Sequence, residues 1–324
     1  MNRTPILLAL AACLSGCTPP VPEEQPLEQP GLTGPRLRVL GTAQDGGFPH
    51  AACSCERCEL ARDDPRTERL VASLALITAD GRVFLIDATP DIRRQIDLLR
   101  DVKPAGGLVD RAPLDGVFLT HAHLGHYTGL AFLGFEAIHA RETPLYATGR
   151  MVDYLSTNGP WSQLVDLRNV VPNKLTPGEP LVLNEQLSVT AYLVPHRDEF
   201  ADTVGFLFAG PTQRVFYVPD TDGWQHWDVA FEDWLDQHRV DVAIVDGSFF
   251  SMDELPGRDV AAIGHPLVIE TVERLKTRVA DGTLEVLFTH FNHSNPVLDA
   301  DRAHRTQVED AGFGVLDDGM ELPL

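Results

Sequence analysis

Three histidines lie close together in residues 120–126, which read THAHLGH. The apolar residues 115–119 before them are predicted to form a short buried strand, and a helix is expected to follow. Two histidines one residue apart on an extended chain point to the same side, and a third at the start of the next helix can face the same point. Converging imidazoles bind Zn²⁺, Fe²⁺ or Mn²⁺, and a solvated turn seldom carries three of them. We therefore predict a metal site that contains His121, His123 and His126.

Three further predicted strands end at a residue that can bind a metal, namely His196, Asp220 and His290. Alone, each has an ordinary explanation, because a histidine at a strand end is often a surface residue and an aspartate before a turn often caps it. However, α/β proteins gather their ligands at the carboxyl ends of strands. We therefore expect these three side chains to join the histidine cluster.

The chain has 324 residues, of which 44% are hydrophobic, and a formal net charge of −21. This length and composition are sufficient for one large domain with a full core. Nucleic acids and anionic membrane surfaces attract basic proteins, so the acidic balance argues against either of them as a partner. We expect a small-molecule substrate, and the composition does not indicate an oligomeric state.

The first 17 residues resemble the signal peptide of a bacterial lipoprotein. A short basic start precedes an apolar stretch too brief to span a membrane, and residues 14–17 (LSGC) resemble the site at which such a precursor is cleaved and its cysteine lipidated. Residues 18–35 are rich in proline and glutamate and are expected to form an extended tether. We expect an exported lipoprotein, held only by lipid on Cys17 at the periplasmic face of a bacterial membrane, and Thr18 favours the outer membrane. The alternative is a buried N-terminal helix with an incidental cysteine.

From residue 36 onward, short apolar strands alternate with amphipathic helices, and we expect one domain over residues 36–324. The predicted strands are 36–41, 71–78, 82–86, 115–119, 187–194, 203–209, 214–218, 240–245 and 284–288. The predicted helices are 91–100, 127–140, 149–156, 224–238, 266–280 and 299–311. Two runs of strands interleaved with helices indicate an α/β fold, a sandwich of two sheets with helices on the outside.

The order and spacing of the candidate ligands resemble those of the metallo-β-lactamase superfamily. Its motif is His-x-His-x-Asp-His, followed later in the chain by a histidine, an aspartate and a last histidine. The resemblance implies an αββα sandwich of two mixed β-sheets flanked by helices, and it implies the role of each ligand. His121, His123 and His196 would hold one metal, His126 and His290 would face a second, and Asp220 would bridge the two.

Gly125 stands where this motif has its aspartate. Glycine has no side chain, so the second metal loses a carboxylate ligand and any proton acceptor that this residue supplies. The second metal can still bind with water in the gap, or it can be absent, so we expect one or two ions. The candidates to compensate are His293, Asp198 and Asp222.

A narrower resemblance covers most of the chain and indicates the branch that contains coenzyme PQQ synthesis protein B. Part of it is shared with the cyclic phosphodiesterase of phosphonate metabolism. Members of this branch are typically cytosolic, which fits poorly with an export signal. The matching segments are 46–49 (GGFP), 158–161 (NGPW), 245–249 (VDGSF), 263–265 (IGH), 289–296 (THFNHSNP) and 318–322 (DGMEL).

Three cysteines, Cys53, Cys55 and Cys58, belong to the predicted domain, and an odd number cannot fully pair in an exported protein. Their spacing can bring three thiolates to one tetrahedral zinc. The resemblance implies that the fourth ligand is His265, and His50 is a weaker candidate. We expect one structural zinc here, separate from the active-site metal. A disulfide with one free thiol is the alternative, although such close spacing strains a disulfide.

The predicted site is compatible with three kinds of function. In a hydrolase, a hydroxide on the metal held by His121 and His123 would attack an ester or phosphodiester, and Asp220 would orient the water. An iron-dependent oxygenase acting on a PQQ-type precursor is the second, because histidines and an aspartate also bind Fe²⁺. A non-enzymatic periplasmic binder of a metal or metabolite is the third. We favour the hydrolase, with Zn²⁺ or Fe²⁺ at the active site and His121, His123 and Asp220 as catalytic residues.

Overall fold

The chain divides into two units, Met1–Gly31 and Leu32–Leu324, and the structure, a computed structural model, describes residues of the second. The described residues are 34–108, 110–254 and 264–324. The predicted signal peptide, Cys17 and residues 18–33 of the predicted tether therefore lie outside the described residues. Among the described helices, we find none with the length and apolar character needed to cross a membrane.

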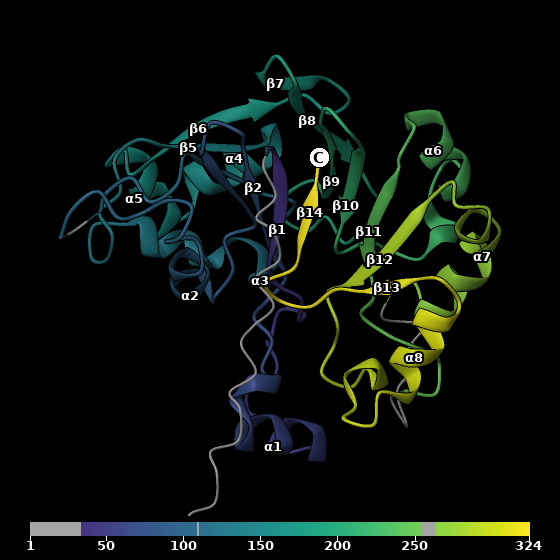
Figure 1. Cartoon of the computed structure of the whole chain (residues 1–324). Coiled ribbons are helices and arrows are strands. Elements are labelled where there is room, and N and C mark those ends of the chain that lie inside the picture. Colours follow the sequence, from purple (N-terminus) through teal and green to yellow (C-terminus); the bar gives the residue numbers. More distant parts are fainter. Residues whose placement is uncertain (1–33, 109, 255–263) are drawn as a thin grey trace, which may run out of the picture. The chain divides into compact units, whose positions relative to one another are not determined.

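The described residues form two mixed β-sheets (Figure 1). The strand order in the first sheet is β14-β1-β2-β3-β4-β5-β6, and β3 to β6 run parallel to one another. Its strands are β1 (Arg36–Gly41), β2 (Ser73–Ile77), β3 (Val83–Ile86), β4 (Gly116–Phe118), β5 (Thr143–Thr148), β6 (Val170–Leu175) and β14 (Glu321–Pro323).

The strand order in the second sheet is β13-β12-β11-β10-β9-β8-β7, and β10 to β13 are parallel. Its strands are β7 (Pro180–Asn184), β8 (Leu187–Leu193), β9 (Val204–Ala209), β10 (Arg214–Val218), β11 (Val242–Asp246), β12 (Glu285–Thr289) and β13 (Gly314–Val315). The helices are α1 (Glu56–Asp63), α2 (Ile92–Asp97), α3 (Leu124–Tyr127), α4 (Gly149–Thr157), α5 (Trp161–Asp166), α6 (Phe231–His238), α7 (Val268–Ala280) and α8 (Ala303–Asp310).

Neighbouring residues on a strand point to opposite faces of the sheet, and this alternation produces three apolar layers. Phe118 of β4 and Tyr217 of β10 belong to the inner layer between the two sheets. Val117 and Phe216, the residues just before them, belong to the outer layers. The outer layers include residues of α2 and α4 on the first sheet and of α6 and α7 on the second (Figure 1). This order of helices, sheet, sheet and helices confirms the predicted αββα sandwich.

Each predicted strand is present, with ends within two residues of the prediction. Five strands were not predicted: β5, β6, β7, β13 and β14. The predicted helix over residues 224–238 begins only at Phe231, after a 3₁₀ turn at Trp224–His226.

The predicted helix over residues 127–140 is wrong. Helix α3 ends at Tyr127 and a 3₁₀ turn follows at Thr128–Leu133. The backbone N–H of Gly129 donates to the carbonyl of Ala88 (2.9 Å) rather than to a carbonyl of the preceding turn. This contact docks the segment against the residues that follow β3, and it places His126 over the end of the first sheet.

Candidate metal centre

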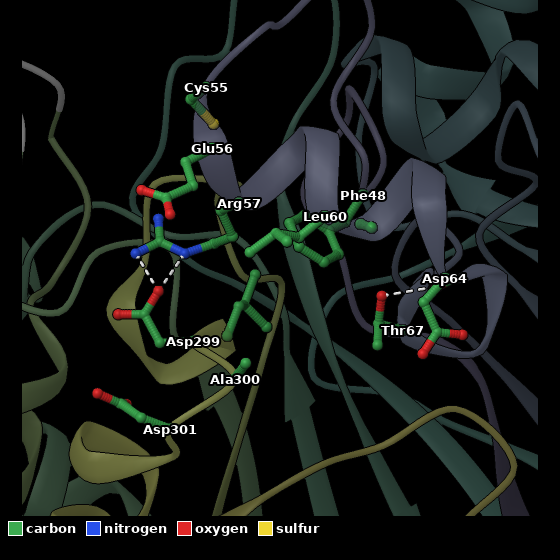
Figure 2. A pocket seen from close by; sticks show the side chains of 12 residues that line it. Phe48, Cys55, Glu56, Arg57, Leu60, Asp64, Thr67, Asp299, Ala300 and Asp301 are labelled. Atoms are coloured by element: carbon green, nitrogen blue, oxygen red, sulfur yellow. Dashed lines mark hydrogen bonds and ion pairs between the residues drawn. The ribbon is translucent and has the colours of Figure 1, made fainter.

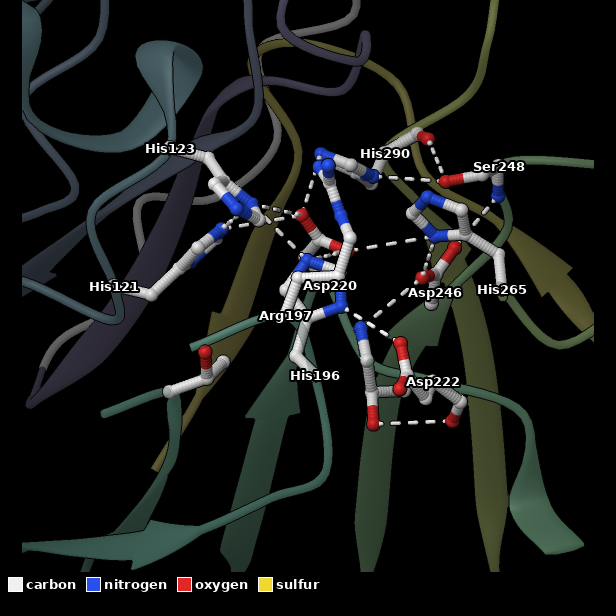
Figure 3. Close-up of polar contacts among 12 residues, drawn as sticks. His121, His123, His196, Arg197, Asp220, Asp222, Asp246, Ser248, His265 and His290 are labelled. Carbon is white, nitrogen blue, oxygen red and sulfur yellow. Dashed lines mark hydrogen bonds and ion pairs between the residues drawn. The ribbon is translucent and has the colours of Figure 1, made fainter. Parts of the chain in front are cut away.

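Metal-binding side chains meet where strands of both sheets end (Figure 3). Strands β10, β11 and β12 run parallel, so the residues that follow them share one edge of the second sheet. The segment after β4 of the first sheet reaches the same place, because Nδ1 of His123 lies 3.1 Å from Nε2 of His196. The structure brings together the six predicted ligands, which are His121, His123, His126, His196, Asp220 and His290.

The first group of ligands consists of His121, His123, His196 and Asp220. Nε2 of His121 lies 3.0 Å from Nδ1 of His123. The two carboxylate oxygens of Asp220 lie 3.2 Å from Nε2 of His121 and 3.2 Å from Nε2 of His196. Nitrogen ligands of a tetrahedral zinc are about 3.3 Å apart, because each lies about 2.0–2.1 Å from the ion. The spacing of this group therefore fits one metal ion.

The second group consists of Asp45, His126 and His290. Oδ1 of Asp45 lies 3.5 Å from Nε2 of His126. Oδ2 of Asp220 lies 3.8 Å from Nε2 of His126 and 4.0 Å from Nε2 of His290. Asp220 therefore faces both groups. Asp45, which follows β1, is a member of this group that the sequence did not reveal.

Three ligand atoms of the second group are buried without a hydrogen-bond partner: Oδ1 of Asp45, Nε2 of His126 and Nε2 of His290. The side chains of both histidines are fully buried. A buried polar atom without a partner costs about 1–3 kcal/mol, and native proteins contain few of them. A metal ion bound by all three would satisfy them together. The residues present therefore fit a second ion.

Asp87 orients His126. Oδ2 of Asp87 lies 2.8 Å from Nδ1 of His126, and the backbone N–H of Thr120 donates to Oδ1 of the same carboxylate (2.8 Å). A carboxylate on one ring nitrogen fixes the imidazole and leaves the other nitrogen for a metal. Burial lowers the pKa of His126, but the nearby carboxylates, with Asp87 foremost, outweigh it and raise this pKa to about 9. The carboxylates around this ring therefore favour positive charge at this position.

The remaining histidines of the two groups also have a partner on one ring nitrogen, and for His121 it is Oγ1 of Thr120, 3.0 Å from Nδ1. Burial and the neighbouring His126 keep the pKa of His121 well below its ordinary value, so this ring is neutral and can bind a metal. The other three histidines have these hydrogen-bond partners: Nδ1 of His290 lies 2.9 Å from Oγ of Ser248, Nδ1 of His196 lies 3.1 Å from Oδ1 of Asp222, and Nε2 of His123 lies 3.0 Å from Oε2 of Glu199.

The three residues expected to compensate for Gly125 lie elsewhere, so that prediction is wrong. Asp222 contacts His196 on the side away from the ligand group, and Asp198 accepts a hydrogen bond from Thr203 (2.9 Å). His293 lies with the cysteines.

His265 lies at the metal centre, beside Asp246 at the end of β11. Nδ1 of His265 lies 2.7 Å from Oδ2 of Asp246 and 3.4 Å from Oδ1 of Asp220. Burial lowers the pKa of His265, but the Asp246 and Asp220 carboxylates outweigh it and raise this pKa to about 9. The prediction that His265 completes the cysteine site is therefore wrong, because the ring is held by these two carboxylates.

The fourth member of the cysteine site is His293 instead. Its Nδ1 lies 3.5 Å from Sγ of Cys53, 3.8 Å from Sγ of Cys55 and 3.7 Å from Sγ of Cys58. In a tetrahedral zinc site with one histidine, sulfur and nitrogen are about 3.6 Å apart, given Zn–S of about 2.3 Å and Zn–N of about 2.0–2.1 Å. The three cysteines are free thiols, which is contrary to the disulfide alternative. The ring of His50 packs against that of His293 in a tilted arrangement, with 4.4 Å between ring centroids.

Two hollows lie near these sites. One, of about 600 Å³, lies beside α1 and is lined by Phe48, Arg57 and Leu60, with an ion pair between Arg57 and Asp299 (2.6 Å) at its wall (Figure 2). None of the six predicted ligands lines it. The other, of about 430 Å³, has Asp45 in its wall. None of the six predicted ligands lines this second hollow either, so Asp45 is its connection to the metal centre.

The comparisons with known proteins agree with this geometry. The sequence matches the model of the beta-lactamase superfamily domain over residues 82–291. Coenzyme PQQ synthesis protein B of Rhodopseudomonas palustris is 30% identical over 312 residues, which cover 89% of this chain and 99% of that protein. The protein of the same name from Cupriavidus necator is 28% identical over 325 residues, which cover 89% and 99% of the two chains.

Solved structures agree as well. Zn²⁺-bound PqqB from Methylobacterium extorquens superposes with a TM-score of 0.74 at 27% identity, covering 89% of this chain and 100% of that chain. A diphosphatase from the PhnP family shares the fold, with a TM-score of 0.61 at 22% identity and coverage of 89% and 96%. The chain therefore belongs to the β-lactamase superfamily. Its relatives place it in the branch that contains coenzyme PQQ synthesis protein B, which confirms the resemblance seen in the sequence.

Proposed function

We propose that this protein is a metal-dependent hydrolase that cleaves an ester or a phosphodiester. One observation carries the proposal: Asp220 is buried between two groups of metal-binding side chains and faces both. The Zn²⁺-bound structure of PqqB from Methylobacterium extorquens supports zinc as the ion. The first ion would be held by His121, His123 and His196, the second by Asp45, His126 and His290, and Asp220 would bridge them.

When bound, Zn²⁺ at these groups lowers the pKa of a coordinated water and polarises a substrate oxygen. The side chains of the protein supply orientation. Asp220 is only 4% exposed, so little solvent screens its carboxylate. Its two oxygens face different histidines, which places Asp220 to orient a water between the groups.

The pair of His265 and Asp246 supports hydrolysis, because a leaving oxygen needs a proton. Asp246 is fully buried and accepts from the backbone N–H of Ser248 (2.8 Å) as well as from Nδ1 of His265 (2.7 Å). These contacts fix the imidazole beside Asp220. The pair is therefore placed to hold a proton at the edge of the metal centre.

Arg197 favours an anionic substrate such as a phosphodiester. It follows the ligand His196, its side chain is 62% exposed, and Nη1 lies 3.3 Å from Oε1 of Glu199. Glu199 in turn pairs with Nε2 of the ligand His123 (3.0 Å). This connection links the exposed guanidinium of Arg197 to a ligand of the first group, and guanidinium groups match the geometry of phosphate oxygens.

The experiment is hydrolysis of bis(p-nitrophenyl) phosphate and p-nitrophenyl acetate by the full chain and by His123→Ala. We expect kcat/KM to fall by about 100-fold or more with the fold unchanged, because metal activation is worth several kcal/mol. His226→Ala, which removes an exposed histidine outside the ligand groups, is the matched control and should retain activity. Equal activity of His123→Ala and the parent chain would contradict the proposal.

A second candidate is an iron-dependent oxygenase that acts on a PQQ-type precursor. It is favoured by the similarity to coenzyme PQQ synthesis protein B, which extends over 89% of the chain. Histidine and aspartate ligands suit Fe²⁺ as well as Zn²⁺. Oxygen uptake by the Fe²⁺-loaded chain, without hydrolysis by the Zn²⁺-loaded chain, would favour the oxygenase. Bound metal with neither activity would favour a non-enzymatic binder.

A further inference from the structure

Asp45 and residue 125 compete for one space. A Cβ built on Gly125 would lie 2.8 Å from Cα and 3.0 Å from Cγ of Asp45, and closer still to Oδ1. Packed interiors have no room for such contacts, and an added carbon would have to displace its neighbours. While Asp45 keeps this position, residue 125 cannot carry a side chain.

The carboxylate that fills this space faces the second group of ligands. Oδ1 of Asp45 is buried, lies 3.5 Å from Nε2 of His126, and has no hydrogen-bond partner among the described residues. Nε2 of His290, also buried and unpaired, completes the group. A carboxylate oxygen and two imidazole nitrogens form a typical zinc ligand set.

The backbone around Asp45 is fixed relative to His290. The N–H of Gln44 donates to the carbonyl of Phe291 (2.9 Å), and the N–H of Phe291 donates to the carbonyl of Thr42 (2.8 Å). These bonds pair the segment after β1 with the segment after β12. Asp45 and His290 are therefore held by neighbouring backbone segments that bond directly to each other.

We propose that Asp45 supplies the carboxylate ligand of the second metal that the superfamily motif supplies from the position of Gly125. The ligand has moved from the histidine motif to the loop after β1, and Gly125 makes room for it. Asp45 also lines the hollow of about 430 Å³, whereas its Oδ1, the atom that faces His126, is buried. The inference rests on the metal centre of the proposed function, but not on the hydrolase activity.

The test measures metal ions per chain by elemental analysis of the full chain after dialysis against a series of chelator concentrations. Asp45→Asn keeps the shape of the side chain and removes its charge. We expect it to lose one ion at chelator concentrations that leave the parent fully loaded, with an affinity about 10-fold or more weaker for that ion. Asp64→Asn is the matched control, because its side chain is 38% exposed against 36% for Asp45 and lies outside the ligand groups. The inference is overturned if Asp45→Asn retains all its ions, or if Asp64→Asn loses an ion as well.

A reciprocal exchange keeps the test informative if Asp45→Asn folds poorly. Asp45→Gly should lose the same ion, and Asp45→Gly/Gly125→Asp should regain it only in part, because the carboxylate returns to the motif position but the new Cβ still lies 2.8 Å from Cα of residue 45 unless the backbone shifts. Gly125→Asp alone should bind fewer ions than the parent, because its side chain collides with Asp45. An Asp45→Gly variant that binds as many ions as the parent would overturn the inference.

Turnover is not part of this readout. A chain that holds its full complement of ions but hydrolyses neither ester would contradict the proposed function and leave the role of Asp45 intact. A chain that hydrolyses both esters while Asp45→Asn keeps all its ions would support the proposed function and overturn the role of Asp45.

Discussion

His290 and His293 are three residues apart in the segment that follows β12, yet their imidazoles face different sites. Nε2 of His290 belongs to the group with Asp45 and His126, whereas Nδ1 of His293 lies 3.5–3.8 Å from the three cysteine sulfurs. One short segment therefore connects the cysteine site to the metal centre.

The first prediction concerns this connection. Cys53→Ala/Cys55→Ala should lose one zinc per chain and melt at a lower temperature, because a structural zinc contributes directly to folding. Its second-group metal should also be easier to remove with a chelator, since the segment that carries His290 loses its anchor. Zinc content and melting temperature test this.

Two single variants test which histidine, His293 or His265, completes the cysteine site. His293→Ala should lose the same zinc as the cysteine variant, whereas His265→Ala should keep it. Retention of that zinc by His293→Ala, with loss in His265→Ala, would contradict the structure.

The second prediction concerns Gly125→Ala. The added methyl group collides with Asp45, so we expect the variant to lose about 1–3 kcal/mol of unfolding free energy and to release its second ion more readily. The same substitution in an Asp45→Gly background should cost less, because Oδ1 and Cγ of Asp45 are gone. Denaturant unfolding of all four chains measures this coupling, and strictly additive losses would argue against it.

The third prediction concerns Asp87, which is fully buried and accepts from both Thr120 and His126. Its φ of 67° lies in the left-handed region, which asparagine tolerates. Asp87→Asn should therefore fold, but metal affinity should fall by about 10–100-fold, because the carboxylate that orients His126 is lost. Chelator titration measures this, with the exposed Asp80→Asn as control. An unchanged affinity would show that Asp87 does not orient the ligand.

The fourth prediction concerns Arg197. Arg197→Gln should raise KM for bis(p-nitrophenyl) phosphate by about 10-fold, the effect of one lost charge-assisted contact, and leave KM for p-nitrophenyl acetate nearly unchanged. Steady-state kinetics on both substrates give the comparison. A similar change for both would argue against recognition of a phosphate by this residue.

The fifth prediction concerns the N-terminal segment, which lies outside the described residues. If Cys17 carries lipid, Cys17→Ser should move the protein from the membrane fraction to the soluble fraction. Cys13→Ser should not, because that residue would be removed with the signal peptide. Fractionation of expressing cells decides this, and membrane association of Cys17→Ser would contradict the lipoprotein assignment.

The sequence predicted the ligands that come directly after apolar strands, such as His121, His196 and His290, because the end of a strand fixes where they lie. It also predicted most of the strands whose residues are mostly buried, although it missed β5, which is one of them. Of the other missed strands, β6 and β7 are edge strands with partly exposed residues, and β13 and β14 have two and three residues.

Asp45 and His293 could not be assigned from sequence. The proposed role of Asp45 as a ligand depends on its side chain filling the space beside Gly125, and these two residues meet only in the folded chain. The segment that covers the cysteines is set by Arg57, whose guanidinium donates to the carbonyls of His293 (3.0 Å) and Ser294 (2.7 Å). Spacing along the chain does not show that contact, and the family resemblance pointed to His265 instead.

The metal content of the full chain, purified without added metal, tests the proposed metal centre most directly. We predict about three ions per chain, falling to two in Asp45→Asn and to two in Cys53→Ala/Cys55→Ala. A single ion that disappears with the cysteines would show that no metal binds at Asp220, and it would rule out the proposed metal centre.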